Sequence, residues 1–293
     1  MKLIFDGDSW AFGSEIADPN LALQYDKNVH PGVYDFLEVN DHYRIPKIYP
    51  HHMSRQLGCD YVNLGWPADD NRTIIERTMS YISTEYLDCN KQTDDIFVII
   101  GWTSPERNSF WWKNGDLSSK FRLRPQDSTF DDTQMKKLWK MYIRHMWHPE
   151  EYMPRHVTTV LQFQNFCNTH NIKWLCYNAF YQTPHQGPDG WQDPNMPEEL
   201  KSIDRKIGGY SYSDNGERSH KDLNFESLWN TVDPVRFYKK DQLSSTFKSF
   251  IDANVDEPLV GWHPSPSGHE AWATELVRYI KENRNYHGFL KRA

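Results

Sequence analysis

A serine and a histidine near opposite ends of the chain have the side chains needed for nucleophilic catalysis. Ser9 completes the triplet Gly7-Asp8-Ser9, which directly follows the apolar run 3–5. His263 begins the polar stretch 263–269, just before a segment with helical periodicity. A serine hydroxyl is a weak nucleophile unless a base takes its proton, and histidine is the commonest such base. The two residues therefore predict a nucleophile and its base, brought together by the fold.

Strand-like and helix-like segments alternate along the chain, and this alternation would position the pair. Apolar runs predict the strands, and apolar residues at helical spacing predict helices between them. The expected strands are residues 2–6, 61–64, 96–100 and 172–177, and the expected helices are 72–88, 133–146, 154–170 and a last helix containing Trp272, Leu276 and Ile280. This pattern is typical of an α/β three-layer sandwich with a mostly parallel sheet. Ser9 would then lie at the carboxyl edge of the sheet, where such folds bind ligands.

Two segments do not fit the alternation. Residues 11–58 are loop-rich in composition, with Pro, Asp, His and Tyr throughout, and residues 180–240 carry many Pro and Gly among polar residues. A long segment without secondary structure inside a compact domain is usually functional. We therefore expect a single domain over residues 1–293, with a loop-rich insertion or cap at about 180–240 that lies over or beside the carboxyl edge.

Four short blocks resemble those of the SGNH (GDSL-type) hydrolase superfamily. They are Gly7-Asp8-Ser9, Asn63-Leu64-Gly65-Trp66-Pro67-Ala68, Gly101-Trp102-Thr103-Ser104 and Val260-Gly261-Trp262-His263-Pro264. The resemblance implies a flavodoxin-like sheet and the activity of an esterase, acetylesterase, lipase or thioesterase. It also implies Ser9 as the nucleophile and His263 as the base. We favour His263 over His269, which opens the last helix.

The fourth block departs from the SGNH pattern at the acid that orients the histidine. Val260 occupies that position, and valine cannot accept a hydrogen bond from an imidazole ring. Either a backbone carbonyl holds the ring or an acid comes from elsewhere. Asp256 and Glu257 are the nearest acids in the sequence, and we take Asp256 as the candidate.

The oxyanion hole also departs from the pattern. The resemblance assigns it the backbone N–H groups of Ser9 and Ala68, although Ala68 stands where the family has a glycine. Thr103 stands where the family has an asparagine, and Asn71 could supply an amide from the neighbouring loop. The alternative for residues 69–71 is that they cap the following helix.

Three tryptophans and an arginine are candidates for substrate binding. Trp66, Trp102 and Trp262 each flank a block, and Arg107 follows the third strand. Indoles around one pocket would suit a flat sugar or acyl face, and Arg107 would bind an anionic group. Alternatively, the tryptophans wall the edge of the sheet and an Arg-Glu pair holds the loop in place.

Composition excludes several classes of function. The net charge of −7 argues against a general nucleic-acid binder, and no apolar run is long enough to cross a membrane. No dinucleotide fingerprint, phosphate-binding loop or metal-ligand spacing is present, so we expect no metal and no cofactor. The four scattered cysteines predict free thiols in a reducing compartment. Because Met1-Lys2 leads directly into the first strand, we expect a cytoplasmic protein without a secretory signal.

The residues and the resemblance together predict a serine ester hydrolase that removes a small acyl group, such as acetyl, from a carbohydrate or similar ester. Its expected partner is a small ester or acylated saccharide. The alternative is a protein that keeps the fold but binds carbohydrate or serves in assembly. Ser9 and His263 favour the enzyme, whereas Val260 and Thr103 favour the alternative. The blocks are also similar to SGNH-like proteins of tailed bacteriophages, which would imply a virion setting.

Overall fold

A parallel sheet forms the centre of the molecule. The computed structural model describes residues 1–24, 31–114, 117–123, 133–145, 149–180, 225–242 and 245–283. The sheet contains β1 (Lys2–Asp6), β2 (Asp60–Asn63), β3 (Ile96–Trp102) and β6 (Lys173–Asn178) in the order β2-β1-β3-β6. All pairings are parallel, and the order is that of the flavodoxin-like fold. The predicted α/β fold class is confirmed.

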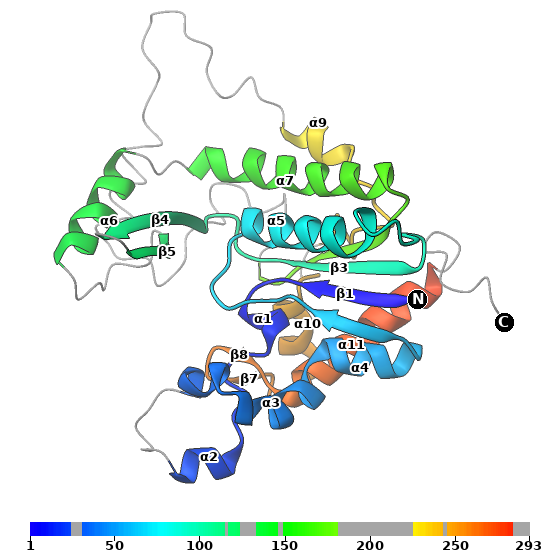
Figure 1. The fold of residues 1–293 in the computed structure, drawn as a ribbon, viewed down its shortest axis with the longest axis horizontal. Coiled ribbons are helices and arrows are strands. Elements are labelled where there is room, and N and C mark those ends of the chain that lie inside the picture. The colour runs from blue at the N-terminus through cyan, green and yellow to red at the C-terminus, as the bar shows by residue number, and fades with distance from the viewer. Residues whose placement is uncertain are drawn as a thin grey trace, which may run out of the picture.

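Helices cover both faces of the sheet, as Figure 1 shows. Successive side chains of a strand point to opposite faces, so Leu3 and Phe5 pack on one layer and Ile4 on the other. The first layer comprises α4 (Tyr49–Leu57), α10 (Phe247–Asn254) and α11 (Pro266–Glu282). The second comprises α5 (Asn71–Ile82), α7 (Pro149–Thr169) and α9 (Phe225–Asn230). A continuous apolar strand such as β3 is buried throughout because both of its faces are covered.

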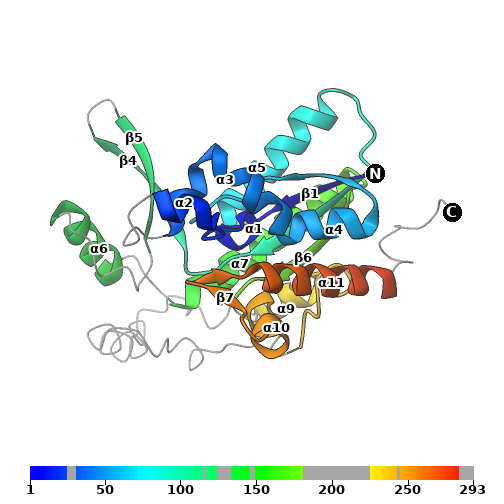
Figure 2. The same ribbon diagram turned by 90° about the horizontal axis from the view of Figure 1, so that it is seen from below.

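The predicted strands and helices lie close to their expected positions. Helix α5 continues into a π-helical turn, η3 (Ser83–Leu87), and α6 (Thr133–His145) and α7 follow the third strand. Several elements were not predicted. Among them, β4 (Asn108–Asn114) and β5 (Leu117–Leu123) form an antiparallel hairpin that projects with α6 beyond the carboxyl edge of the sheet (Figures 1 and 2).

The prediction of a loop-rich segment over residues 11–58 was wrong for most of its length. After α1 (Ser9–Phe12), the chain forms several short helices and then α4, which packs on α11. The short helices are α2 (Pro19–Gln24), η1 (Pro31–Phe36), α3 (Glu38–Arg44) and η2 (Ile45–Lys47). Packing of buried residues such as Tyr49 and Met53 outweighs the polar composition.

The predicted insertion at 180–240 falls largely outside the described residues, because positions 181–224 are not among them. Its described end, however, belongs to the core. Trp229, Val232 and Phe237 are buried, and Phe237 extends the sheet alongside Cys176 in β6. Residues 225–240 therefore belong to the core rather than to a cap.

The last short elements lead to the histidine. The two-residue strands β7 (Leu259–Val260) and β8 (His263–Pro264) form a tight hairpin just before α11. Ser265 caps α11 by accepting the Gly268 N–H, and Pro266 occupies the first turn. Within the described part of the chain, no helix combines the length and the apolar character needed to cross a membrane.

Candidate functional site

Ser9 is the first residue of α1, directly after the carboxyl end of β1. The side chain of Asp8 caps this short helix by accepting the Trp10 N–H at 3.0 Å. The reversal of strand order between β1 and β3 places this turn at the switch point of the sheet, the usual ligand position in open α/β folds. Ser9 is largely buried but retains some exposure.

Asp8 ties the serine turn to the end of β3. Its Oδ2 accepts the Thr103 hydroxyl at 2.6 Å and the Arg107 guanidinium at 2.7 Å. Because the Thr103 hydroxyl proton is committed to Asp8, Thr103 does not supply it to an oxyanion. Arg107 likewise is buried and paired with Asp8 rather than extended towards an external anion. Both side chains therefore hold the turn through Asp8.

Asn71 is also committed to the framework. Its amide nitrogen donates to the Thr103 carbonyl and to Nδ1 of His156, both at 3.1 Å, and its oxygen accepts the Thr103 N–H at 2.8 Å. Burial lowers the pKa of His156 to about 3, so its neutral ring can accept this bond. Both amide hydrogens of Asn71 are used, which leaves none for an oxyanion. The neighbouring Asp70 caps α5 through the Thr73 N–H, as the capping alternative predicts.

Two backbone N–H groups remain available at the edge. Neither the Ser9 nor the Ala68 N–H donates a hydrogen bond within the described residues. Ala68 has a φ of +70°, in the left-handed region that costs a non-glycine residue about 1 kcal/mol. The SGNH pattern has glycine at this position. Backbone strain of this kind is characteristic of functional sites.

His263 lies on an element that contacts the serine helix. Strand β8 packs against α1, and Figure 1 shows the β7–β8 hairpin beside α1. The His263 side chain is 18% exposed, and its Nε2 makes no hydrogen bond in the described part of the chain. No hydrogen bond joins Ser9 to His263 among these residues.

An acid that the sequence analysis missed lies beside the histidine. Oε2 of Glu15 is 3.1 Å from Nδ1 of His263 and accepts the Trp262 N–H at 2.8 Å. Glu15 is only 3% exposed, whereas the predicted Asp256 is exposed and forms no ion pair or hydrogen bond with His263. The sequence offered one signal for Glu15: it is an acid that lies only a few residues after Ser9 in the same segment.

His269, the alternative base, is part of the core. Its Nδ1 accepts the Tyr49 N–H at 3.2 Å, and the two rings stack. Burial lowers the pKa of His269 to about 3, so the ring stays neutral. These contacts make His269 part of the core packing. No cluster of three or more His, Cys, Asp or Glu side chains that could hold a metal ion is found among the described residues.

The three tryptophans differ sharply in exposure. Trp102 is 1% exposed and packs against His156 and Phe163 in the layer of α7, so it cannot border a pocket, which corrects that prediction. Trp66 is 50% exposed, and its backbone N–H donates to the Gly7 carbonyl near the serine turn. Trp262 is 79% exposed at the tip of the β7–β8 hairpin. Two indoles are thus left at the rim of the site.

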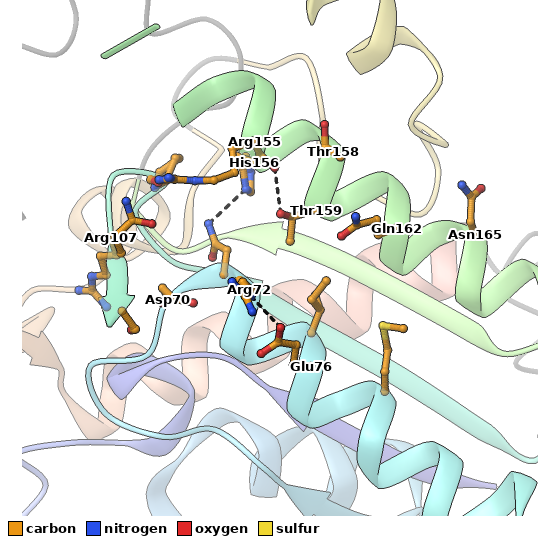
Figure 3. Close-up of a pocket in the computed structure, with 16 residues that line it drawn as sticks. Asp70, Arg72, Glu76, Arg107, Arg155, His156, Thr158, Thr159, Gln162 and Asn165 are labelled. Carbon is orange, nitrogen blue, oxygen red and sulfur yellow. Dashed lines mark hydrogen bonds and ion pairs between the residues drawn. The ribbon is translucent and has the colours of Figure 1, made fainter. Parts of the chain in front are cut away.

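A cavity of about 1030 Å³ lies between α5 and α7 (Figure 3). Its walls are α5, with Arg72 and Glu76, and α7, with His156 and several uncharged polar side chains. Arg107 lines one end and also contacts Asp8. Ser9 and His263 do not line this cavity. The cavity therefore belongs to the α5–α7 face.

Comparison with known proteins gives one family and several structural similarities. The model of the family of unknown function DUF6071 matches residues 23–189. A lipolytic protein of the G-D-S-L family from Desulfitobacterium hafniense DCB-2 is 11% identical, with a TM-score of 0.41 and coverage of 95% of this chain and 98% of that one. The acetylxylan esterase Axe2 from Geobacillus stearothermophilus is 13% identical, with a TM-score of 0.41 and coverage of 95% and 93%.

A third similar structure is longer. The acetyl xylan esterase Est2A from Butyrivibrio proteoclasticus is 13% identical with a TM-score of 0.43, and the match covers 97% of this chain and 64% of Est2A. The chain thus spans about two thirds of that protein. No curated protein matches the sequence.

Proposed function

The chain belongs to DUF6071, a family of unknown function, and we propose that it is a serine ester hydrolase of the SGNH type. The observation that carries this proposal is the contact between α1, which begins with Ser9, and β8, which begins with His263. This contact between two elements from opposite ends of the chain supports a hydroxyl and an imidazole acting together at one edge of the sheet. The available N–H groups of Ser9 and Ala68 support the same reading, because acyl transfer needs donors for a developing oxyanion.

The reaction follows from these groups. Oγ of Ser9 attacks the acyl carbon as Nε2 of His263 takes its proton, and the N–H groups of Ser9 and Ala68 stabilise the resulting oxyanion. The tetrahedral intermediate collapses, and the leaving alkoxide takes the proton from His263 to depart as an alcohol. A water molecule, deprotonated by His263, then attacks the acyl-serine. The second tetrahedral intermediate then collapses, which releases the carboxylic acid, and His263 returns its proton to Oγ of Ser9.

The substrate that we propose is a small acyl ester, such as an acetyl ester, of a carbohydrate. Exposed Trp66 and Trp262 support a flat apolar face in the alcohol part, since indoles pack well against sugar rings. Phe36 adds a third exposed ring 5.4 Å from Trp66. The tailed-bacteriophage origin suggested by the blocks stays a prediction.

Initial-rate measurements on 4-nitrophenyl acetate and an acetylated xylo-oligosaccharide test the proposal. We expect wild-type turnover on at least one of them, with kcat lower by about 10³-fold or more in both Ser9→Ala and His263→Ala, because these side chains act as a unit. Ser54→Ala, on the distant helix α4, serves as the control and should retain wild-type turnover. Turnover that survives in Ser9→Ala would refute the proposal. Saccharide binding without any turnover would instead support the binding-protein alternative.

A further inference from the structure

We propose that Glu15 is the positioning residue that orients His263, in place of the aspartate that the fourth block lacks. This inference rests on the proposed ester hydrolysis, because an orienting acid matters only if His263 acts as a base. The Val260 position pairs directly with His263 in the hairpin but presents an apolar side chain. The acid would therefore come from the segment that follows the nucleophile, not from the segment that precedes the histidine.

The geometry suits this role. Oε2 of Glu15 lies 3.1 Å from Nδ1 of His263, within ion-pair range, and the buried Nδ1 forms no hydrogen bond with any described residue. A rotation of the imidazole that aligns its N–H with the carboxylate would complete a hydrogen bond. The contact uses Nδ1 and leaves Nε2 for Ser9, as a catalytic histidine requires.

The surroundings make this contact electrostatically effective. Glu15 is 3% exposed, and a carboxylate removed from water is strongly unfavourable unless charged or polar groups meet it. The backbone N–H of Trp262, in the same hairpin as His263, donates a hydrogen bond to Oε2 of Glu15. When His263 accepts the serine proton, the resulting imidazolium would lie against this buried negative charge, which stabilises it.

The backbone on both sides is shaped to bring the carboxylate there. Glu15 has a φ of +67°, an unfavourable conformation for glutamate, and its N–H donates to Asp35 at 2.8 Å. Opposite it, Gly261 has a φ of +59°, and a Cβ at that position would collide with Oε2 of Glu15. Strain at Glu15 and the absence of a side chain at Gly261 are both needed for this placement. Two independent local features therefore serve one contact.

The variant Glu15→Gln tests the inference, since it keeps the shape and removes the charge. We expect kcat on the ester substrate to fall by about 10²- to 10⁴-fold with KM within about threefold of wild type; the corresponding change in trypsin costs about 10⁴. Glu275→Gln is the matched control, because it makes the same change at a buried glutamate of α11, whose carboxylate accepts hydrogen bonds from Tyr238 and Arg278. Its kcat should stay within about fivefold of wild type.

The tautomer of His263, read from ¹⁵N imidazole shifts and assigned with His263→Ala, gives a readout that turnover does not. In the wild type the neutral ring should carry its proton on Nδ1. In Glu15→Gln the proton should move towards Nε2, since the glutamine amide can donate to Nδ1. An Nε2-protonated wild type would overturn the inference, as would a folded Glu15→Gln in which either kcat or the tautomer is unchanged. Turnover independent of Ser9 would instead refute the hydrolase, whatever the tautomer.

Discussion

At the scale of single residues, polar side chains at the sheet edge fall into two groups. Asp8, Thr103 and Asn71 use their polar atoms on one another and on backbone groups, which fixes the turn before Ser9. The Ser9 hydroxyl and Nε2 of His263 make no such bonds in the described part of the chain. A site preorganised in this way leaves only the reacting groups free to meet a substrate. Position in a motif alone could not separate the two groups, because both kinds of residue flank the same strands.

Gly261 gives a prediction at this scale. Replacing it with alanine introduces a Cβ that collides with Glu15 and strains a backbone with a φ of +59°. We expect Gly261→Ala to lower kcat by about 10²-fold or more, because Glu15 is displaced from His263, and to lower the free energy of unfolding by about 1–3 kcal/mol. Ester turnover and urea unfolding measure the two effects.

Gly58→Ala is the matched control for that variant. Gly58 has a φ of +62°, but a Cβ there would meet no atom within 4 Å. It should therefore reproduce the backbone strain, about 1 kcal/mol, and leave turnover unchanged. If Gly261→Ala costs no more stability than Gly58→Ala and keeps full turnover, the close packing of Glu15 against the hairpin matters neither for stability nor for ester turnover.

At the scale of elements, the strands of the central sheet could be predicted from the sequence because each one is encoded by a local apolar run. Continuous apolar runs mark β3 and β6, and capping residues such as Asp70 mark where helices begin. The sheet order then follows from the few connections that parallel strands allow. Contacts between segments far apart in the sequence could not be predicted in this way. The Glu15–His263 contact joins the two ends of the chain, and no local pattern encodes it.

The tryptophans show the same limit. Trp102 ends β3 with its side chain on the α7 side, so alternation along the strand buries it. Trp66 and Trp262 lie in the connection after β2 and in the hairpin turn, where nothing covers them fully. A tryptophan next to a motif is thus a candidate for the rim only when it leaves the strand, and the bounds of β3 decide this for Trp102.

At the scale of the whole molecule, each helical layer contains a buried neutral histidine. His156 lies in the α7 layer and His269 in the α11 layer, and burial lowers the pKa of each to about 3. An unfolded chain binds a proton at these residues near pH 6.5, whereas the folded chain resists it until about pH 3. Stability contributed by these groups is therefore lost as the pH falls below about 6.5. Asp6 acts in the opposite direction, because burial raises its pKa to about 6.

The variant His269→Asn isolates one of these contributions, since asparagine can still accept the Tyr49 N–H. Between about pH 7.5 and about pH 5, the wild type should lose about 2 kcal/mol more of its free energy of unfolding than the variant does. Urea unfolding at the two pH values measures the difference, and Asp6 cancels because both proteins contain it. An equal loss in both proteins would mean that His269 does not resist protonation in the folded state.

The most direct test of the central claim is the reaction of the folded chain with a fluorophosphonate, followed by mass spectrometry of its peptides. The reagent modifies serines that a neighbouring base activates. We predict a single adduct on Ser9 in the wild type, strongly slowed labelling in His263→Ala and none at this position in Ser9→Ala. A native chain that forms no adduct, or a His263→Ala variant labelled on Ser9 at the wild-type rate, would contradict the account.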